Sequence, residues 1–182
     1  MTSENKRMLP KILAPIIIVM VVAGIWVVKN FASDDSQQMH SAGTNGASNP
    51  DFVLVTKSLD LEQLKSYGLP VMINFGSNGC APCRAMFPVI QEINAEYQGK
   101  VIVKFADVWE DKTLAEGFPL DVIPTQFFFT ADGKPYKPSD PDGMGMMLYT
   151  NEATGEHIYT AHKGSMTKEM IVEVFQELGV GE

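Results

Sequence analysis

The chain has 182 residues, 45% of them hydrophobic, and a formal net charge of −8. This length suits one domain of common size with an additional segment, and the apolar fraction is sufficient for a packed core. The acidic balance argues against nucleic acid as a partner, because nucleic-acid binding calls for a clustered basic surface.

The N-terminus resembles a membrane anchor. Lys6, Arg7 and Lys11 precede an apolar run over residues 12–28, which at 1.5 Å per residue spans roughly 25 Å. We therefore expect residues 1–11 to be cytoplasmic, residues 12–28 to form a transmembrane signal-anchor, and the remaining chain to be extracytoplasmic, at the cell surface or in the periplasm. A cleaved signal peptide is the alternative, but the run is long for one and no strong cleavage site follows it.

A flexible linker is expected next. Residues 29–50 are rich in Ser, Ala, Gly and Asn and have no apolar period. The pattern becomes globular over residues 51–182.

The first half of the globular part alternates strands with helices. We expect strands at 52–56, 70–75 and 101–108, and helices at 58–67, 83–98 and 111–116. The continuous apolar run at 70–75 is typical of a central strand buried on both faces. Apolar residues line one face of the helix at 83–98, while Pro88 within it predicts a kink.

The second half contains adjacent strands. We expect strands at 125–130, 146–150 and 156–161, a turn at 131–134, and a final amphipathic helix at 167–178. Early strand–helix–strand units imply parallel pairing, and the later adjacent strands imply an antiparallel extension. The predicted fold class is therefore α/β, with a mixed central sheet and helices on both faces.

Cys80 and Cys83 are the only cysteines of the chain. A structural staple across Cys-x-x-Cys is disfavoured, because so small a ring removes little entropy from the unfolded chain. Zinc would need two further ligands, such as His157 and His162, but these lie far beyond the usual finger spacing. Their offset of five residues in a strand also predicts side chains on opposite faces.

Copper(I) is a related alternative, because Met144, Met146 and Met147 supply soft ligands near those histidines. Methionines in a loop are more often packing material. A redox pair has a clearer mechanism, since Cys80 is placed at the positive end of the helix dipole, where a thiolate is favoured. Cys83, one turn further in, is placed to resolve a mixed disulfide.

Four separated motifs resemble the thioredoxin family over residues 52–180. They are "NFGSNGCAPCRAMFPVIQEI", "VIVKFADV", "VIPTQFFFTADGK" and "HKGSMTKEMI". The resemblance implies a thioredoxin-like fold and thiol–disulfide exchange through a redox-active Cys80–Cys83 disulfide, with no other cofactor and no metal. Cys80 takes the place of the nucleophile and Cys83 that of the resolving cysteine.

The resemblance also implies a substrate-docking surface. Pro124 matches a cis-proline that faces the cysteines and docks the substrate backbone, and Gly164 matches the glycine after the last strand. The other substrate-binding positions are Ile123, Thr125, Gly79, Ala81 and Pro82.

Several positions depart from the family pattern. Gly79 stands where a Trp usually precedes the first cysteine, and Asn74 stands where the family has a buried Asp that assists the resolving cysteine. Lys104 matches the lysine that usually faces this acid, so Asn74 and Lys104 are candidate tuning positions. Glu110 and Asp107 are substitutes for the acid, although an exposed charge is the favoured interpretation of each.

An insertion at 135–160 adds a hairpin to the family pattern, either as an elaborated sheet edge or as an adaptable docking surface.

The combined interpretation is an anchored enzyme that reduces disulfides of extracytoplasmic proteins. Anchored relatives imply electron supply from an integral membrane thiol reductase of the cytochrome c biogenesis type. A copper-handling thioredoxin-like module is the alternative.

Overall fold

The computed structural model describes residues 49–181. The expected cytoplasmic segment at 1–11, the anchor at 12–28 and nearly all of the linker at 29–50 lie outside the described residues. Within residues 49–181, none of the helices has the length and apolar character needed to cross a membrane.

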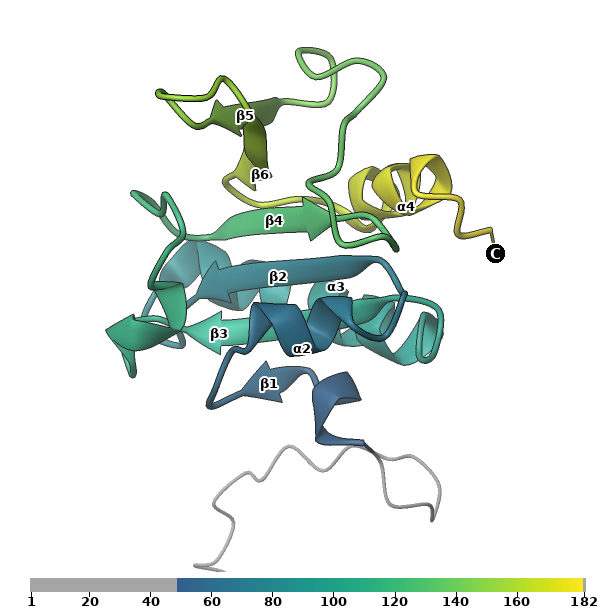
Figure 1. Ribbon diagram of the computed structural model, residues 1–182. Helices are drawn as coiled ribbons and strands as arrows, with labels where there is room; N and C mark the ends of the chain where they lie inside the picture. Colours follow the sequence, from purple (N-terminus) through teal and green to yellow (C-terminus); the bar gives the residue numbers. More distant parts are fainter. Residues whose placement is uncertain (1–48, 182) are drawn as a thin grey trace, which may run out of the picture. The chain divides into compact units, whose positions relative to one another are not determined.

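The elements follow the predicted order (Figure 1). The strands are β1 Val55–Thr56, β2 Val71–Gly76, β3 Ile102–Asp107, β4 Thr125–Phe129, β5 Met146–Thr150 and β6 His157–Lys163. The α-helices are α2 Leu61–Lys65, α3 Ala81–Glu96 and α4 Lys168–Glu177, with 3-10 helices η1 Pro50–Phe52 and η2 Lys112–Ala115.

The strands form one mixed sheet in the order β1-β3-β2-β4-β6-β5. β3 pairs in parallel with β1 and β2, whereas β2/β4, β4/β6 and β5/β6 are antiparallel. This confirms the predicted mixed α/β sheet, with parallel pairing early in the chain and antiparallel pairing later. The inserted β5 extends the sheet at its edge.

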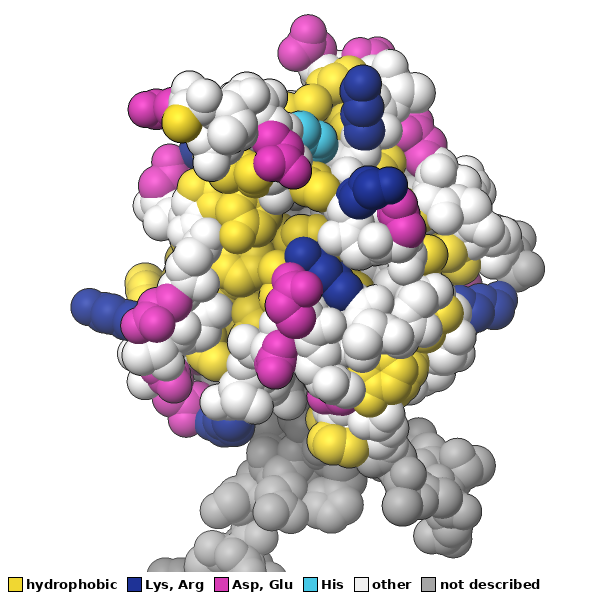
Figure 2. Space-filling model, viewed as in Figure 1, with side chains coloured by type: hydrophobic (Ala, Val, Ile, Leu, Met, Phe, Trp, Pro, Cys, Tyr) yellow, Lys and Arg dark blue, Asp and Glu magenta, His cyan; other side chains and the backbone are white. Residues whose placement is uncertain are grey.

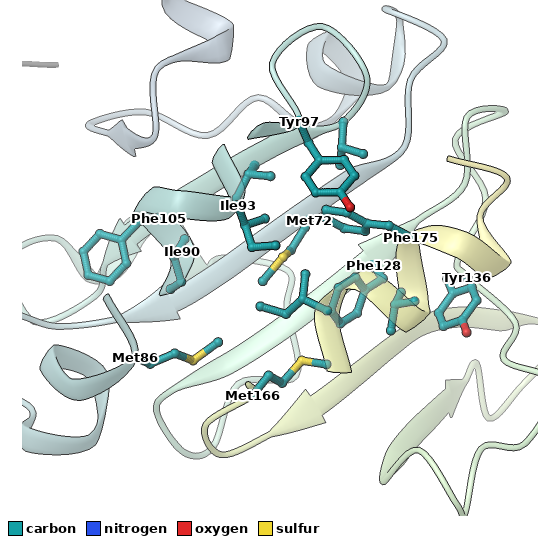
Figure 3. Packing of buried hydrophobic residues seen from close by; sticks show 14 of the residues in the cluster. Met72, Met86, Ile90, Ile93, Tyr97, Phe105, Phe128, Tyr136, Met166 and Phe175 are labelled. Carbon is teal, nitrogen blue, oxygen red and sulfur yellow. The ribbon is translucent and has the colours of Figure 1, made fainter. Parts of the chain in front are cut away.

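Helices cover both faces of the sheet. On one face, Ile90 and Ile93 of α3 and Phe175 of α4 pack with Met72 and Phe128 (Figure 3). These five side chains are fully buried, and each such burial stabilises the fold by about 1.5–3 kcal/mol. The opposite face packs against α2 and η2. On the face viewed in Figure 2, Lys and Arg lie interspersed with Asp and Glu around a band of hydrophobic surface.

The N-terminal elements are shorter than predicted. The strand expected at 52–56 is wrong at its start, because Pro50 opens a 3-10 helix and the Asn49 side chain accepts the N–H of Asp51. The helix expected at 58–67 begins only after Asp60, whose side chain accepts the N–H of Gln63. In both places a local cap overrides the hydrophobic pattern. The helix expected at 111–116 is also a short 3-10 helix.

The insertion is attached to α4. The Glu177 carboxylate accepts hydrogen bonds from the Tyr136 hydroxyl at 2.6 Å and the Ser139 N–H at 3.0 Å. These bonds hold the chain that leads into β5, so the insertion is an ordered part of the sheet edge.

A bulge corrects one expectation about the histidines. Thr150 pairs with His157 but Tyr149 pairs with Tyr159, so one extra residue lies in β6. The bulge shifts the alternation of side chains by one position. His157 Nε2 consequently lies 2.8 Å from Oγ1 of Thr160, a residue on the same face as His162. The predicted opposite faces are wrong.

Candidate functional site

The two cysteines lie where β2 leads into α3. They form a disulfide in which Cys80 is the N-cap residue of α3, and the N–H of Cys83 points at Cys80 Sγ at 3.3 Å. The helix therefore begins at residue 81, before the predicted start at 83. Pro82 fits this first turn because its missing N–H has no partner to lose there. In the reduced state, the same N–H and the helix dipole favour a Cys80 thiolate.

A distant loop meets the disulfide. The Ile123–Pro124 peptide bond is cis, and the carbonyl oxygen of Ile123 lies 3.8 Å from Cys80 Sγ. Gly164, at φ 101°, donates its N–H to the carbonyl of Pro124 at 2.8 Å. Tertiary structure thus brings Cys80, Ile123, Pro124 and Gly164 together at one site.

The surface around the disulfide is apolar and accessible. Cys80 is 7% exposed and Cys83 2% exposed, so Cys80 is the sulfur that a substrate meets first. Val122 is 48% exposed beside the cis peptide bond, and its carbonyl accepts the Thr125 hydroxyl at 2.8 Å. Of the positions expected in substrate binding, Gly79, Ala81 and Pro82 are exposed and Ile123 is partly buried, whereas Thr125 is buried.

Trp109 occupies the space beside Gly79. A Cβ atom at Gly79 would lie 2.7 Å from both Cε3 and Cζ3 of the Trp109 ring. The indole, 62% exposed, therefore covers the position where the resemblance implies a Trp side chain. An aromatic surface is present next to Cys80, but it comes from the loop after β3. Nothing in the local sequence pattern indicated this role.

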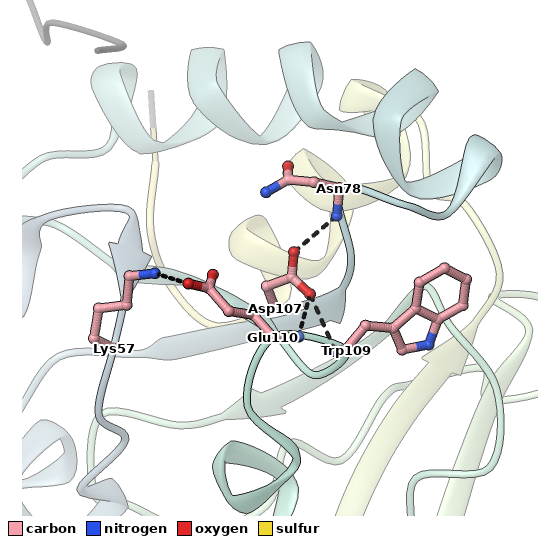
Figure 4. A network of polar contacts seen from close by, with 5 residues as sticks. All are labelled: Lys57, Asn78, Asp107, Trp109 and Glu110. Carbon is pink, nitrogen blue, oxygen red and sulfur yellow. Dashed lines mark hydrogen bonds and ion pairs between the residues drawn. The ribbon is translucent and has the colours of Figure 1, made fainter. Parts of the chain in front are cut away.

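Asp107 braces the loop before the cysteines (Figure 4). Its Oδ2 accepts the N–H of Asn78 at 2.8 Å, and its Oδ1 accepts those of Trp109 and Glu110 at 3.1 Å each. Burial raises the pKa of Asp107, but the hydrogen bonds from Asn78, Ser77 and the two following residues outweigh it and lower the pKa.

The expectation of an exposed charge is therefore wrong for Asp107, which is 7% exposed. Glu110 is exposed and forms an ion pair with Lys57 at 2.5 Å (Figure 4). Asp107 thus binds backbone N–H groups of the active-site loop, and Glu110 binds a lysine at the surface.

Asn74 and Lys104 lie on different faces of the sheet. Lys104 pairs with Ile73, and adjacent strand residues point to opposite faces. Its Nζ donates to the carbonyls of Pro50 and Val53, at 3.0 Å each. Burial lowers the pKa of Lys104, and the charge of Asp51 opposes this. Lys104 therefore does not face Asn74, which is fully buried on the side of α3.

The methionines of the insertion do not converge. Met146 is buried in the cluster beneath α3 and α4, and Met144 packs against that cluster. Met147 points the other way and is 42% exposed. Within residues 49–181, no three His, Cys, Asp or Glu side chains are grouped to hold a metal ion. No observation at this place favours copper handling.

The chain is similar to several known proteins. The family model described as Thioredoxin matches residues 52–145. Thioredoxin from Rickettsia bellii (strain RML369-C) is 36% identical over 73 residues, which cover 40% of this chain and 69% of that protein. Thioredoxin 1 from Nostoc sp. is 31% identical over 80 residues, which cover 44% and 75%. The structure of Malassezia sympodialis thioredoxin (Mala s 13) aligns at 22% identity with a TM-score of 0.45, covering 76% of this chain and 97% of that one.

Proposed function

Because the chain belongs to the thioredoxin family and is a thiol–disulfide oxidoreductase, we propose that it reduces disulfides of extracytoplasmic proteins while anchored in a membrane. The anchor rests on the basic residues before the apolar run at 12–28. Electrons come from an integral membrane thiol reductase of the cytochrome c biogenesis type.

The observation that carries the chemistry is the arrangement of Cys80. Its Sγ caps α3 and lies beside the carbonyl of Ile123. The exposed side chain of Trp109 lies against the preceding residue Gly79, and exposed Val122 precedes Ile123. A polypeptide disulfide fits such a surface, because an extended backbone meets the cis-proline loop while its side chains contact apolar groups.

The reaction is a two-step exchange. The Cys80 thiolate attacks one sulfur of the substrate disulfide and releases the other as a thiolate. Cys83 then attacks Cys80 Sγ, which frees the second substrate thiol and leaves the Cys80–Cys83 disulfide that the structure contains. The substrate gains two electrons, and the dithiol loses two.

Replacement of the resolving cysteine tests the proposal. Cys83→Ser in the full-length chain should accumulate a mixed disulfide with substrate proteins, and the product should disappear on adding dithiothreitol. Cys80→Ser is the matched control and should trap nothing. Equal trapping by both variants contradicts the roles assigned to the two cysteines.

The direction of electron flow and the location need separate measurements. A reduction potential of about −270 mV supports the role as a reductant, whereas a potential of about −120 mV contradicts that role. In membrane fractionation, the full-length chain should remain with the membranes. Protease added from the extracytoplasmic side should then digest the globular part. A domain protected by the cytoplasmic membrane contradicts the proposed location.

A further inference from the structure

Three polar side chains cross the sheet in one row. Asn74 of β2 pairs with Gln126 of β4, and Gln126 pairs with His162 of β6. Side chains paired across neighbouring strands point to the same face. All three are therefore on the face covered by α3 and α4, where they are 0%, 0% and 9% exposed. Met146 of the inserted β5 continues the row beyond His162.

The hydrogen bonds of this row have one direction. Gln126 Nε2 donates to Asn74 Oδ1 at 2.8 Å, so Gln126 Oε1 faces the other way, 3.3 Å from His162 Nδ1. An amide oxygen only accepts, and therefore Nδ1 of His162 carries the hydrogen. Each donor in the row points toward Asn74, whose Nδ2 is the last donor. This Nδ2 is buried and has no hydrogen-bond partner.

The unpaired amide and the resolving cysteine are both neighbours of Gly76. A Cβ atom built on Gly76 would lie 3.4 Å from Asn74 Nδ2 and 3.4 Å from Cys83 Cβ. The amide and Cys83 thus both lie next to Gly76, together with the Phe105 ring, whose Cε2 would be 2.9 Å from the same Cβ position. A buried N–H group without a partner is unfavourable. Cys83 is a neighbour that becomes negatively charged during the reaction.

We propose that His162, Gln126 and Asn74 form a donor row that stabilises the Cys83 thiolate, in the place where the family has a buried acid. Asn74 is the catalytic residue of the row, because its unpaired Nδ2 is the group that would donate to the Cys83 thiolate. Gln126 and His162 are positioning residues that fix the orientation of the Asn74 amide. The inference rests on thiol–disulfide exchange by Cys80 and Cys83, and not on its direction or cellular location.

The row acts in the resolving step. Cys83 loses its proton to water, and its thiolate attacks Cys80 Sγ of the mixed disulfide. The Cys80–Cys83 bond forms, the bond between Cys80 and the substrate breaks, and the substrate sulfur leaves with the electron pair and takes up a proton. Donation by Asn74 raises the fraction of Cys83 that is ionised and ready to attack.

The surroundings of the row are neutral. Burial lowers the pKa of His162, and its hydrogen bond with the Gly164 backbone opposes this, so the ring acts as a neutral donor at pH 7. Gln126 and Met146 face the ring, and a Cβ atom built on Gly145 would lie 3.5 Å from its Cδ2 and Nε2.

Charged groups near Cys83 are directed elsewhere. The Lys104 ammonium is on the opposite face of the sheet, and the oxygens of Asp107 hold backbone N–H groups of the neighbouring loop. Exposed Arg84 donates from Nη1 to the carbonyl of Asn78 at 3.1 Å. The donor row is therefore the side-chain feature expected to stabilise the Cys83 thiolate.

Two-phase reaction of the reduced full-length chain with 5,5′-dithiobis(2-nitrobenzoate) tests the inference. The first thionitrobenzoate is released when Cys80 attacks, and the second when Cys83 resolves the mixed disulfide. Asn74→Leu should slow the second release about tenfold at pH 7 and raise the midpoint of its pH profile by about one unit, since one hydrogen bond to a charged group is lost. The first release should change less than about twofold.

The other variants separate positioning from folding. His162→Leu should shift the midpoint in the same direction, and His162→Asn should restore it because its N–H₂ lies near the place of Nδ1. His157→Asn is the matched control and should leave both phases unchanged. Gln126→Met has a side chain of similar shape and should raise the midpoint of the second phase as Asn74→Leu does. It provides the test if Asn74→Leu does not fold.

An unchanged second-phase midpoint in folded Asn74→Leu or Gln126→Met overturns the donor row. Slowing that is equal at every pH also overturns it, because only a change in the Cys83 pKa moves the midpoint. Absence of both phases in the unmodified chain would instead refute thiol–disulfide exchange itself, so the two failures are distinguishable.

Discussion

Asp107→Asn should destabilise the protein by removing one acceptor from the loop that carries the cysteines. The two oxygens have separate tasks, since Oδ2 accepts from Asn78 and Oδ1 accepts from Trp109 and Glu110. An Asn oxygen replaces only one of them, and its N–H₂ then faces a backbone N–H. Loss of one hydrogen bond to a charged acceptor costs about 2 kcal/mol, which corresponds to a fall in Tm of roughly 6–8 °C for a domain of this size.

The stability difference between the native chain and Asp107→Asn should also depend on pH. The pKa of Asp107 is lowered from its ordinary 3.8 in the folded protein, so its contribution is complete above about pH 4 and is lost as the pH falls through the folded-state pKa. The difference in unfolding free energy between the native chain and Asp107→Asn should therefore be full at pH 7 and shrink toward pH 3.

Urea unfolding of the oxidised protein at both pH values measures this difference. Glu110→Gln is the matched control, because this exposed neighbour forms only a surface ion pair and should cost less than about 0.5 kcal/mol. Equal stability of Asp107→Asn and the native chain at pH 7 refutes the reasoning. So does a difference that is undiminished at pH 3.

Three further outcomes are expected. Trp109→Ala should lower kcat/KM for a protein disulfide about tenfold but leave unfolding nearly unchanged, because the indole is a 62% exposed contact surface; equal loss with a small disulfide would contradict this. Gly79→Ala should displace the indole, seen as a shift in tryptophan fluorescence, because its Cβ would lie 2.7 Å from the ring. Glu177→Gln should weaken the hydrogen bonds from Tyr136 and Ser139 and lower the free energy of unfolding by about 0.5–1 kcal/mol at neutral pH. Hydrogen bonds from Ser139 and Tyr136 lower the pKa of Glu177, so this difference in urea stability should fade below about pH 4.5, and a constant difference would contradict it.

The sequence by itself determined the order of the elements and the redox pair. A continuous apolar run marked β2 as a buried strand, and the helical spacing of Met86, Ile90 and Ile93 marked the inward face of α3. These patterns are local, because side-chain periodicity follows directly from backbone geometry. The Cys-x-x-Cys pair was readable for the same reason, since its chemistry depends on the start of the helix that follows it.

Local caps limited the accuracy of the boundaries. Asn49 and Asp60 satisfy backbone N–H groups and thereby set where η1 and α2 begin. The bulge near His157 was equally hidden, because strand register depends on the partner strand and not on the alternation within one strand.

Only the tertiary structure decided which residues surround the positions that depart from the family pattern. It places Trp109 over Gly79, turns Asp107 into the brace of the active-site loop, and aligns Asn74 with Gln126 and His162. These residues are brought together by strand pairing and loop packing over long sequence separations. Hydrophobic periodicity records which face of an element is buried, but it does not record which residue of a distant element lies opposite.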